Sequence, residues 1–199
     1  MKRKSYRALF AIAAIAAVIS GCSQNGTLNV KNNCRTEFVG HIDNQFVQLA
    51  PGQVYPLDVY IGKSAGLIGP KEYDITIEGS AWTKRQFTTS VTVKSDETTT
   101  YAITDDTGAI LFWNAYNLQV NAVSVRKCTD TDFGPNLVTT GRPFSPGDKL
   151  VIQLDAGCWD VLVNYGRQEL KDIVESDTLA VGRIDTMGWF PGYTPTATR

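Results

Sequence analysis

Apolar and polar residues alternate with a period of two over most of the chain. Short runs of this kind, rich in Val, Ile, Thr and Tyr, recur over residues 28–103 and again over residues 110–125. Turn-forming clusters such as Pro51-Gly52 and Ser95-Asp96 separate them. Because successive side chains of a strand point to opposite faces of a sheet, this pattern predicts half-buried β-strands. We therefore expect an all-β, antiparallel fold.

The first 21 residues have a different character. Four basic residues stand within the first seven positions, and residues 8–19 are apolar without interruption. A charged region followed by an apolar one is the layout of a secretory signal. The apolar run of 12 residues is too short to cross a bilayer core as a helix, which takes roughly 20 residues. This length favours cleavage over a permanent span.

The end of the apolar run indicates the type of signal. Ile19-Ser20-Gly21-Cys22 places small residues directly before a cysteine and resembles the lipobox of bacterial lipoproteins. The resemblance implies diacylglycerol on the Cys22 thiol, cleavage before Cys22 and acylation of the new amino group. Two or three acyl chains would hold the protein firmly in a membrane, whereas one alone holds only marginally. The alternative is an ordinary secretory signal followed by a chance cysteine.

The residue after Cys22 bears on the location. Ser23 stands where aspartate would resemble the inner-membrane retention signal of enteric bacteria. The resemblance therefore implies a lipid anchor in the cell envelope, with the outer membrane favoured if the source has two membranes.

Two stretches of the mature chain echo each other. Leu49-Ala50-Pro51-Gly52-Gln53 leads to Tyr73-Asp74, and Phe144-Ser145-Pro146-Gly147-Asp148 leads to Trp159-Asp160. Each has an apolar residue, a Pro-Gly turn, a strand and an aromatic-Asp pair, and a Gly-rich loop insertion over residues 61–70 accounts for the longer first copy. The echoes predict two small Ig-like β-sandwich modules in tandem. One larger β-sandwich is the alternative.

These patterns divide the chain as follows: a signal peptide over residues 1–21, a lipidated tether over 22–27, modules over 28–106 and 107–190, and a flexible tail over 191–199. Near the end of the second module the pattern is mixed. Leu170, Ile173 and Val174 have helical spacing, whereas residues 178–184 alternate. A short helix and a closing strand both remain open there.

The second half resembles small β-sandwich modules of bacterial extracytoplasmic proteins. The resemblance rests on three motifs: Phe133-Gly134-Pro135-Asn136-Leu137, Pro146-Gly147 and Gly157-Cys158-Trp159-Asp160-Val161. It implies a fold and no particular activity.

Three cysteines remain after lipidation of Cys22, and an oxidising envelope favours one disulfide with one thiol left over. In the arrangement above, Cys128 ends one strand and Cys158 starts another, so we predict a Cys128–Cys158 disulfide. Cys34 lies in the other module and is expected to be a buried or partnered thiol.

Charge and composition exclude several classes of function. Removal of residues 1–21 takes away 4 of the 19 Lys and Arg and none of the 20 Asp and Glu, which leaves 15 minus 20, or −5. A mildly acidic chain lacks the clustered Lys and Arg that nucleic-acid binding needs. A nucleophilic triad would have to be built around His41, the only histidine. His41 lies in an alternating run and is expected on the surface of a strand.

Metal and cofactor motifs are sparse. One histidine and scattered cysteines are a poor zinc set, and no phosphate loop, dinucleotide fingerprint or haem motif occurs. We therefore expect no cofactor. Asp130 and Asp132 have the i, i+2 spacing of calcium loops, but Gly141 stands where an EF-hand needs glutamate. Weak calcium binding and a solvated acidic loop are both open for this pair.

Aromatic residues give the remaining candidates for a contact surface. Trp82 follows Gly79-Ser80-Ala81 in a predicted hairpin turn and is expected to be exposed, whereas Trp113 and Trp159 lie in strand patterns that suggest the core. Trp189 and Phe190 form a second candidate surface. The leading hypothesis is a non-enzymatic, anchored binding or assembly module that contacts an envelope protein or a glycan through its loops. A carboxylate-based envelope hydrolase and a purely structural lipoprotein are the alternatives.

Overall fold

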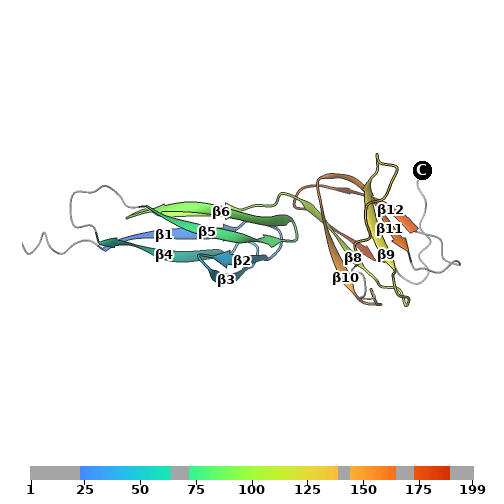
Figure 1. Ribbon diagram of the computed structural model, residues 1–199, viewed down its shortest axis with the longest axis horizontal. Helices are drawn as coiled ribbons and strands as arrows, with labels where there is room; N and C mark the ends of the chain where they lie inside the picture. The colour runs from blue at the N-terminus through green and yellow to red at the C-terminus, as the bar shows by residue number, and fades with distance from the viewer. Residues whose placement is uncertain (1–22, 64–71, 139–143, 165–172, 189–199) are drawn as a thin grey trace, which may run out of the picture.

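The computed structural model describes residues 23–63, 72–138, 144–164 and 173–188. Its regular structure in these ranges consists of 13 β-strands, without an α-helix. None of the described segments forms a helix with the length and apolarity needed to cross a bilayer. Two modules follow one another along the long axis of the molecule (Figure 1). The predicted all-β, sandwich-like fold is confirmed.

Module 1 contains seven strands in two sheets. The strands are β1 (Ser23–Asn32), β2 (Phe38–Ile42), β3 (Gln45–Leu49), β4 (Val54–Lys63), β5 (Glu72–Ala81), β6 (Lys84–Lys94) and β7 (Thr98–Ile103). One sheet has the order β4-β1-β7 and the other β3-β2-β5-β6. Because one face of each sheet meets solvent, burial alternates along the strands, as in β2.

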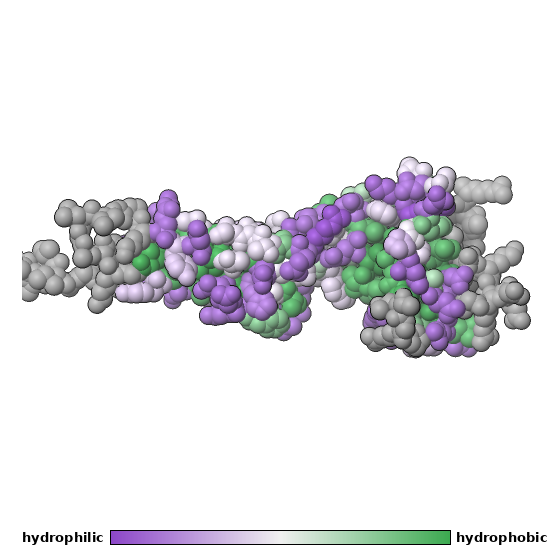
Figure 2. Space-filling view, viewed as in Figure 1, coloured by the Kyte–Doolittle hydropathy of each residue, from purple (hydrophilic) through white to green (hydrophobic). Residues whose placement is uncertain are grey.

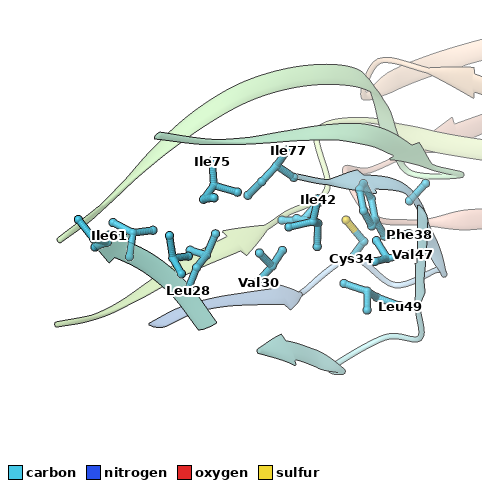
Figure 3. Packing of buried hydrophobic residues seen from close by; sticks show 14 residues of the cluster. Leu28, Val30, Cys34, Phe38, Ile42, Val47, Leu49, Ile61, Ile75 and Ile77 are labelled. Carbon is cyan, nitrogen blue, oxygen red and sulfur yellow. The ribbon is translucent and has the colours of Figure 1, made fainter. Parts of the chain in front are cut away.

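The core of module 1 lies between these two sheets. Leu28 and Val30 of β1 face Ile75 and Ile77 of β5, and all four are fully buried (Figure 3). Each such side chain contributes about 1.5–3 kcal/mol on burial. The Cys34 thiol lies at one end of this cluster near Phe38 and is 2% exposed. Module 1 therefore has a hydrophobic core of its own.

Module 2 contains six described strands. They are β8 (Gly108–Trp113), β9 (Ala122–Lys127), β10 (Lys149–Leu154), β11 (Gly157–Asn164), β12 (Ile173–Leu179) and β13 (Ile184–Gly188). The sheets have the orders β10-β8-β13 and β12-β11-β9. A second, separate core cluster lies between them, with Ile110, Phe112 and Val163 among its most buried members. Two cores agree with two sandwiches rather than one larger one.

The two modules share one connectivity. In module 1 the first strand, β1, pairs antiparallel with β4 and parallel with the last strand, β7. In module 2 the first strand, β8, pairs antiparallel with β10 and parallel with the last strand, β13. The expectation of purely antiparallel sheets is wrong at these two pairs. Pairing between the first and last strands of a module joins distant segments, and no local pattern specifies its direction.

The Pro-Gly turns that echo in the sequence occupy equivalent places in the modules. Gly52 and Gly147 have φ angles of 80° and 89°, in the left-handed region that glycine adopts without steric cost. The N–H of Gly52 donates to the carbonyl oxygen of Asn32 at 2.7 Å, and that of Gly147 donates to Asn114 at 2.7 Å. Each turn is thereby tied to the end of the first strand of its module.

A buried asparagine repeats with the turn. The Asn32 Nδ2 donates to the carbonyl oxygens of Thr36 and Leu49 at 2.9 and 2.7 Å. The Asn114 Nδ2 donates to those of Leu118 and Phe144 at 2.9 and 3.2 Å. Both asparagines are fully buried.

The aromatic-Asp pairs repeat as well. Asp74 of β5 accepts a hydrogen bond from the Thr92 hydroxyl across the sheet, and Asp160 of β11 accepts one from Ser176, both at 2.6 Å. The sequence echoes therefore mark structurally equivalent positions in two copies of one module.

The copies differ beside their second strands. In module 1, β3 covers the outer edge of β2 after a tight turn at Asp43 and Asn44. In module 2, residues 134–138 run along the outer edge of β9, where Gly134 donates to Val125 and Leu137 donates to Val123. An irregular segment thus takes the place of a strand and covers the same edge.

Three expectations about local structure need correction. Residues 23–27, expected within a tether, belong to β1, which pairs with β4 from Ser23 onward. Residues 61–63, expected in a loop insertion, belong to β4, and Ile61 is buried. Over its described residues, 173–188, the closing segment is two strands, β12 and β13, which are joined by a turn at Gly182, whereas Leu170 lies outside the described residues. Polar or glycine-rich strand ends carry no side-chain alternation, so the sequence pattern cannot show them.

Candidate functional site

The junction between the modules is short and tied down by hydrogen bonds. Residues 104–107 connect β7 to β8. The N–H groups of Asp106 and Thr107 both donate to the Thr83 carbonyl oxygen at 3.0 Å, in the turn between β5 and β6. Thr83 and Thr107 are fully buried. The connection is therefore packed against module 1.

One side chain of module 2 holds the same turn from the other side. The Gln153 Nε2 of β10 lies 2.6 Å from the Ala81 carbonyl oxygen, 3.1 Å from that of Trp82 and 3.2 Å from that of Lys84. These contacts span about 70 positions of sequence. An ion pair between Arg85 and Asp155, 2.8 Å long, also crosses the junction but is more than half exposed. Exposed pairs contribute little, so Gln153 is the main direct link.

Carboxylates at the junction are occupied by structural contacts. Asp105 accepts hydrogen bonds from the Thr83 hydroxyl and from the Arg35 N–H. Burial raises the pKa of the nearby Cys34 thiol to about 12, and the negative charge of Asp105 is the second cause of this rise. Burial raises the pKa of Asp106, but hydrogen bonds from Lys84 and the Arg85 N–H outweigh it, and the net pKa is lowered. Both acids therefore serve the junction itself.

A groove opens beside this junction, with a cavity volume of about 690 Å³. We call it the junction groove. Its apolar lining is formed by Val39, Pro51, Ala81, Trp82 and Val151. Val39 and Trp82 are 36% and 45% exposed, so the groove presents apolar surface to solvent. The volume falls within the range of about 300–1,000 Å³ typical of small-molecule sites.

The polar lining of the junction groove contains Arg35, Thr36, Glu37, Ser80 and Gln153. It carries one positive and one negative side chain, both exposed. Glu37 is its single carboxylate. The lining therefore has no net charge and offers both hydrogen-bond donors and acceptors.

Trp82 is fixed at the groove by contacts to its backbone. Its N–H donates to the Thr36 hydroxyl at 3.0 Å, and its carbonyl oxygen accepts from Gln153. Because these contacts already order the Trp82 backbone, a ligand that binds to the indole does not have to order it. The entropic cost of binding is therefore lower. The exposed position predicted for Trp82 agrees with its exposure of 45% in the structure.

The other predicted residues lie elsewhere. Cys128 and Cys158 form a disulfide with a Cα–Cα distance of 5.4 Å, as expected. Cys34 is the buried free thiol. His41 lies on β2 beside Glu78, with 3.4 Å between the Nδ1 and Oε1 atoms and nearly half of each side chain exposed. Cys22, Trp189 and Phe190 lie outside the described residues.

Two tryptophans and the acidic loop need separate comment. Trp113 and Trp159 were expected in the core. Both are partly buried, with Lys149 and Lys127 over their rings, and Trp159 packs against the core cluster of module 2. Asp130 and Asp132 are exposed, and no group of three or more possible metal-ligating side chains occurs in the described part of the chain.

No sequence motif marks Gln153, Arg35 or Glu37 as site residues. The only sign for Gln153 is a polar residue inside the apolar run Leu150-Val151-Ile152-Gln153-Leu154. An outward-facing strand position of this kind can bind solvent or a second module, and the sequence does not distinguish the two.

Comparison with known proteins adds little to this picture. The sequence matches no protein family model and no curated protein. Among solved structures, the chain is similar to one titled "The Bacillus anthracis TIE protein", with a TM-score of 0.32 and 10% identity. The match covers 84% of this chain and 34% of that one.

Proposed function

We propose that this chain is a lipid-anchored protein of the bacterial cell envelope that binds an envelope protein or a glycan at the junction groove and catalyses no reaction. The observation that carries the binding proposal is the position of Trp82. Its indole is exposed in a groove of about 690 Å³, and both backbone polar groups of the residue are hydrogen-bonded.

The anchoring proposal rests on the lipobox and on where the mature chain begins. Ser23, the residue after Cys22, starts β1 at the end of module 1 that lies away from module 2 (Figure 1). The strand leads from there toward the junction. Lipid on Cys22 would place that end of module 1 at the membrane and the junction groove a full strand length away, where it can meet a partner.

The lining of the junction groove supports binding over hydrolysis. A glycosidase uses two carboxyl groups on either side of the scissile bond, whereas Glu37 is the single carboxylate that lines this groove. Asp105 and Asp106 are held by contacts within the junction. His41 lies on β2 and is not among the residues that line the groove.

Replacement of the lipobox cysteine tests the anchor. Cys22→Ala removes the thiol that would carry diacylglycerol, so we expect the variant to leave the membrane fraction or to be mislocalised. Alkaline washing of membranes followed by immunoblotting measures this. A Ser23→Ala variant, which keeps the cysteine, serves as control. Recovery of Cys22→Ala in washed membranes at the wild-type level would contradict lipid anchoring.

Site-specific photocrosslinking tests binding at the junction groove. A photoreactive amino acid at position 82, in the full-length protein in cells, should give discrete adducts, because the residue lines the groove. The matched control places it at position 60, because Tyr60 is an exposed aromatic residue at the other end of module 1. Mass spectrometry identifies the adducts. Equal adduct patterns from both positions, or none from position 82, would argue against this site.

A further inference from the structure

We infer that the ligand of the junction groove is an uncharged saccharide. This inference rests on the proposed binding function and specifies its ligand class. Three properties of the groove carry it: an exposed indole on a hydrogen-bonded backbone, a lining with no net charge, and module 1 strands that are flanked on both sides. Figure 2 shows hydrophobic surface on module 2 and a hydrophilic band beside the junction. The groove lining itself combines apolar and polar side chains.

The aromatic contact suits a sugar ring. A pyranose has one face of C–H groups, which can lie flat on an indole, and a rim of hydroxyl groups. Trp82 is 45% exposed and its backbone is held by Thr36 and Gln153. Val39 and Val151 extend the apolar surface beside it. The Trp82 indole and the two valines, with polar side chains in the same lining, match a ligand that is apolar on its face and polar at its edge.

The polar lining suits hydroxyl groups. A sugar hydroxyl both donates and accepts, and the groove supplies a guanidinium donor from Arg35, a carboxylate acceptor from Glu37 and a hydroxyl from Ser80. The charges of Arg35 and Glu37 offset each other. An anionic polymer would instead need clustered positive charge.

The strand order argues against an extended peptide. Peptides that add to a sheet bond to the free edge of a strand. Val39 lies on β2, which is flanked by β3 and β5, and Ala81 lies on β5, which is flanked by β2 and β6. Of the strands that line the groove, β10 alone is at the edge of its sheet. The groove thus offers mainly side chains, which suits a compact polar ligand better than a strand.

The test uses the mature lipoprotein, purified in a detergent without a sugar headgroup, on an array of neutral and anionic glycans. We expect binding to neutral glycans, followed by titration calorimetry with the best one. Trp82→Ala should weaken that affinity by about tenfold or more because the stacking surface is lost. Trp82→Phe should lie between the two, and Tyr60→Ala, an exposed aromatic outside the groove, should bind as the wild type does.

Salt dependence separates a neutral ligand from a charged one. The affinity should change by less than about twofold between about 50 and 500 mM NaCl, because screening acts on charges. The saccharide assignment is overturned if no neutral glycan binds, if Trp82→Ala binds as tightly as the wild type, or if binding is confined to anionic glycans and falls with salt. Protein adducts from position 82 together with a blank array would reject the saccharide and leave the proposed binding function standing. A blank array without adducts would reject both.

Discussion

Replacing both bridged cysteines, as in Cys128→Ser with Cys158→Ser, should lower the free energy of unfolding of module 2 by about 3 to 4 kcal/mol. The disulfide closes a loop with a sequence separation of 30, and the chain-entropy model gives this value for a loop of that size. The two cysteines lie in register at the ends of β9 and β11, where the Cys128 N–H donates to Cys158 at 3.1 Å. The bridge therefore fixes two neighbouring strands of one sheet.

The loss should reach the segment that follows the bridge. Residues 129–138 lead from Cys128 to the outer edge of β9. Within this region the Arg126 Nε donates to Asp160 at 2.9 Å, and its guanidinium lies 4.4 Å from the centre of the Phe133 ring. Without the disulfide, the contacts of Arg126 with Thr131 and Phe133 and the hydrogen bonds of residues 134–138 to β9 would remain, but the start of the segment would lose its covalent link to β11. We therefore expect loss of the disulfide to speed hydrogen exchange more in residues 129–138 and in β9 than in the core strand β8.

A urea titration with pulsed hydrogen exchange and mass spectrometry measures the unfolding free energy of each module. It reports on both modules in one sample. The transition of β11 should move to lower urea, whereas that of β5 in module 1 should stay in place. Reduction of the wild type should reproduce the double variant. Cys34→Ala is the matched control, because that thiol is buried in module 1 and should affect only that module. An unchanged β11 transition would refute the prediction, as would two alkylatable thiols at 128 and 158 in protein purified without reductant.

The strands were predictable from the sequence where one face of a sheet meets solvent. In β2, Phe38 and Ile42 are buried while Val39 and His41 are not, and this contrast is visible as alternation. The expected tether over residues 22–27 fails this test because the side chains of residues 23–27 are polar or absent. Those residues are in a strand because their backbone pairs with β4, and such pairing leaves no mark on the side-chain pattern.

The Pro-Gly turns were predictable for a different reason. Gly52 and Gly147 occupy backbone conformations that favour glycine, so the chemistry of the turn is written into the local sequence. The candidate site was only half predictable. Trp82 could be assigned to an exposed turn, but the groove also needs Gln153 and Val151 from module 2. Contacts between segments about 70 positions apart depend on how the modules meet, which no local pattern specifies.

Asn32→Ala and Asn114→Ala should each destabilise one module and spare the other. Each change removes two hydrogen bonds from a buried Nδ2 group to carbonyl oxygens, and a buried polar group that loses its partner costs about 1–3 kcal/mol. The Phe144 carbonyl oxygen keeps the Val120 N–H as a donor. We expect a loss of about 2 to 5 kcal/mol in module 1 for Asn32→Ala. The neighbouring Asn33→Ala is a matched control, because Asn33 is exposed and should change the unfolding free energy by less than about 0.5 kcal/mol.

The two losses should differ in a way that the structure specifies. The Asn32 Oδ1 also accepts the Cys34 N–H at 2.9 Å, whereas the Asn114 Oδ1 is buried without a hydrogen-bond partner in the described part of the molecule. Removing Asn114 therefore relieves one unfavourable group that Asn32 does not have. Asn32→Ala should cost more than Asn114→Ala by about 1 kcal/mol, measured by the same two-module urea titration. Equal losses, or the reverse order, would contradict the prediction that the unpartnered Oδ1 makes Asn114 contribute less to stability than Asn32.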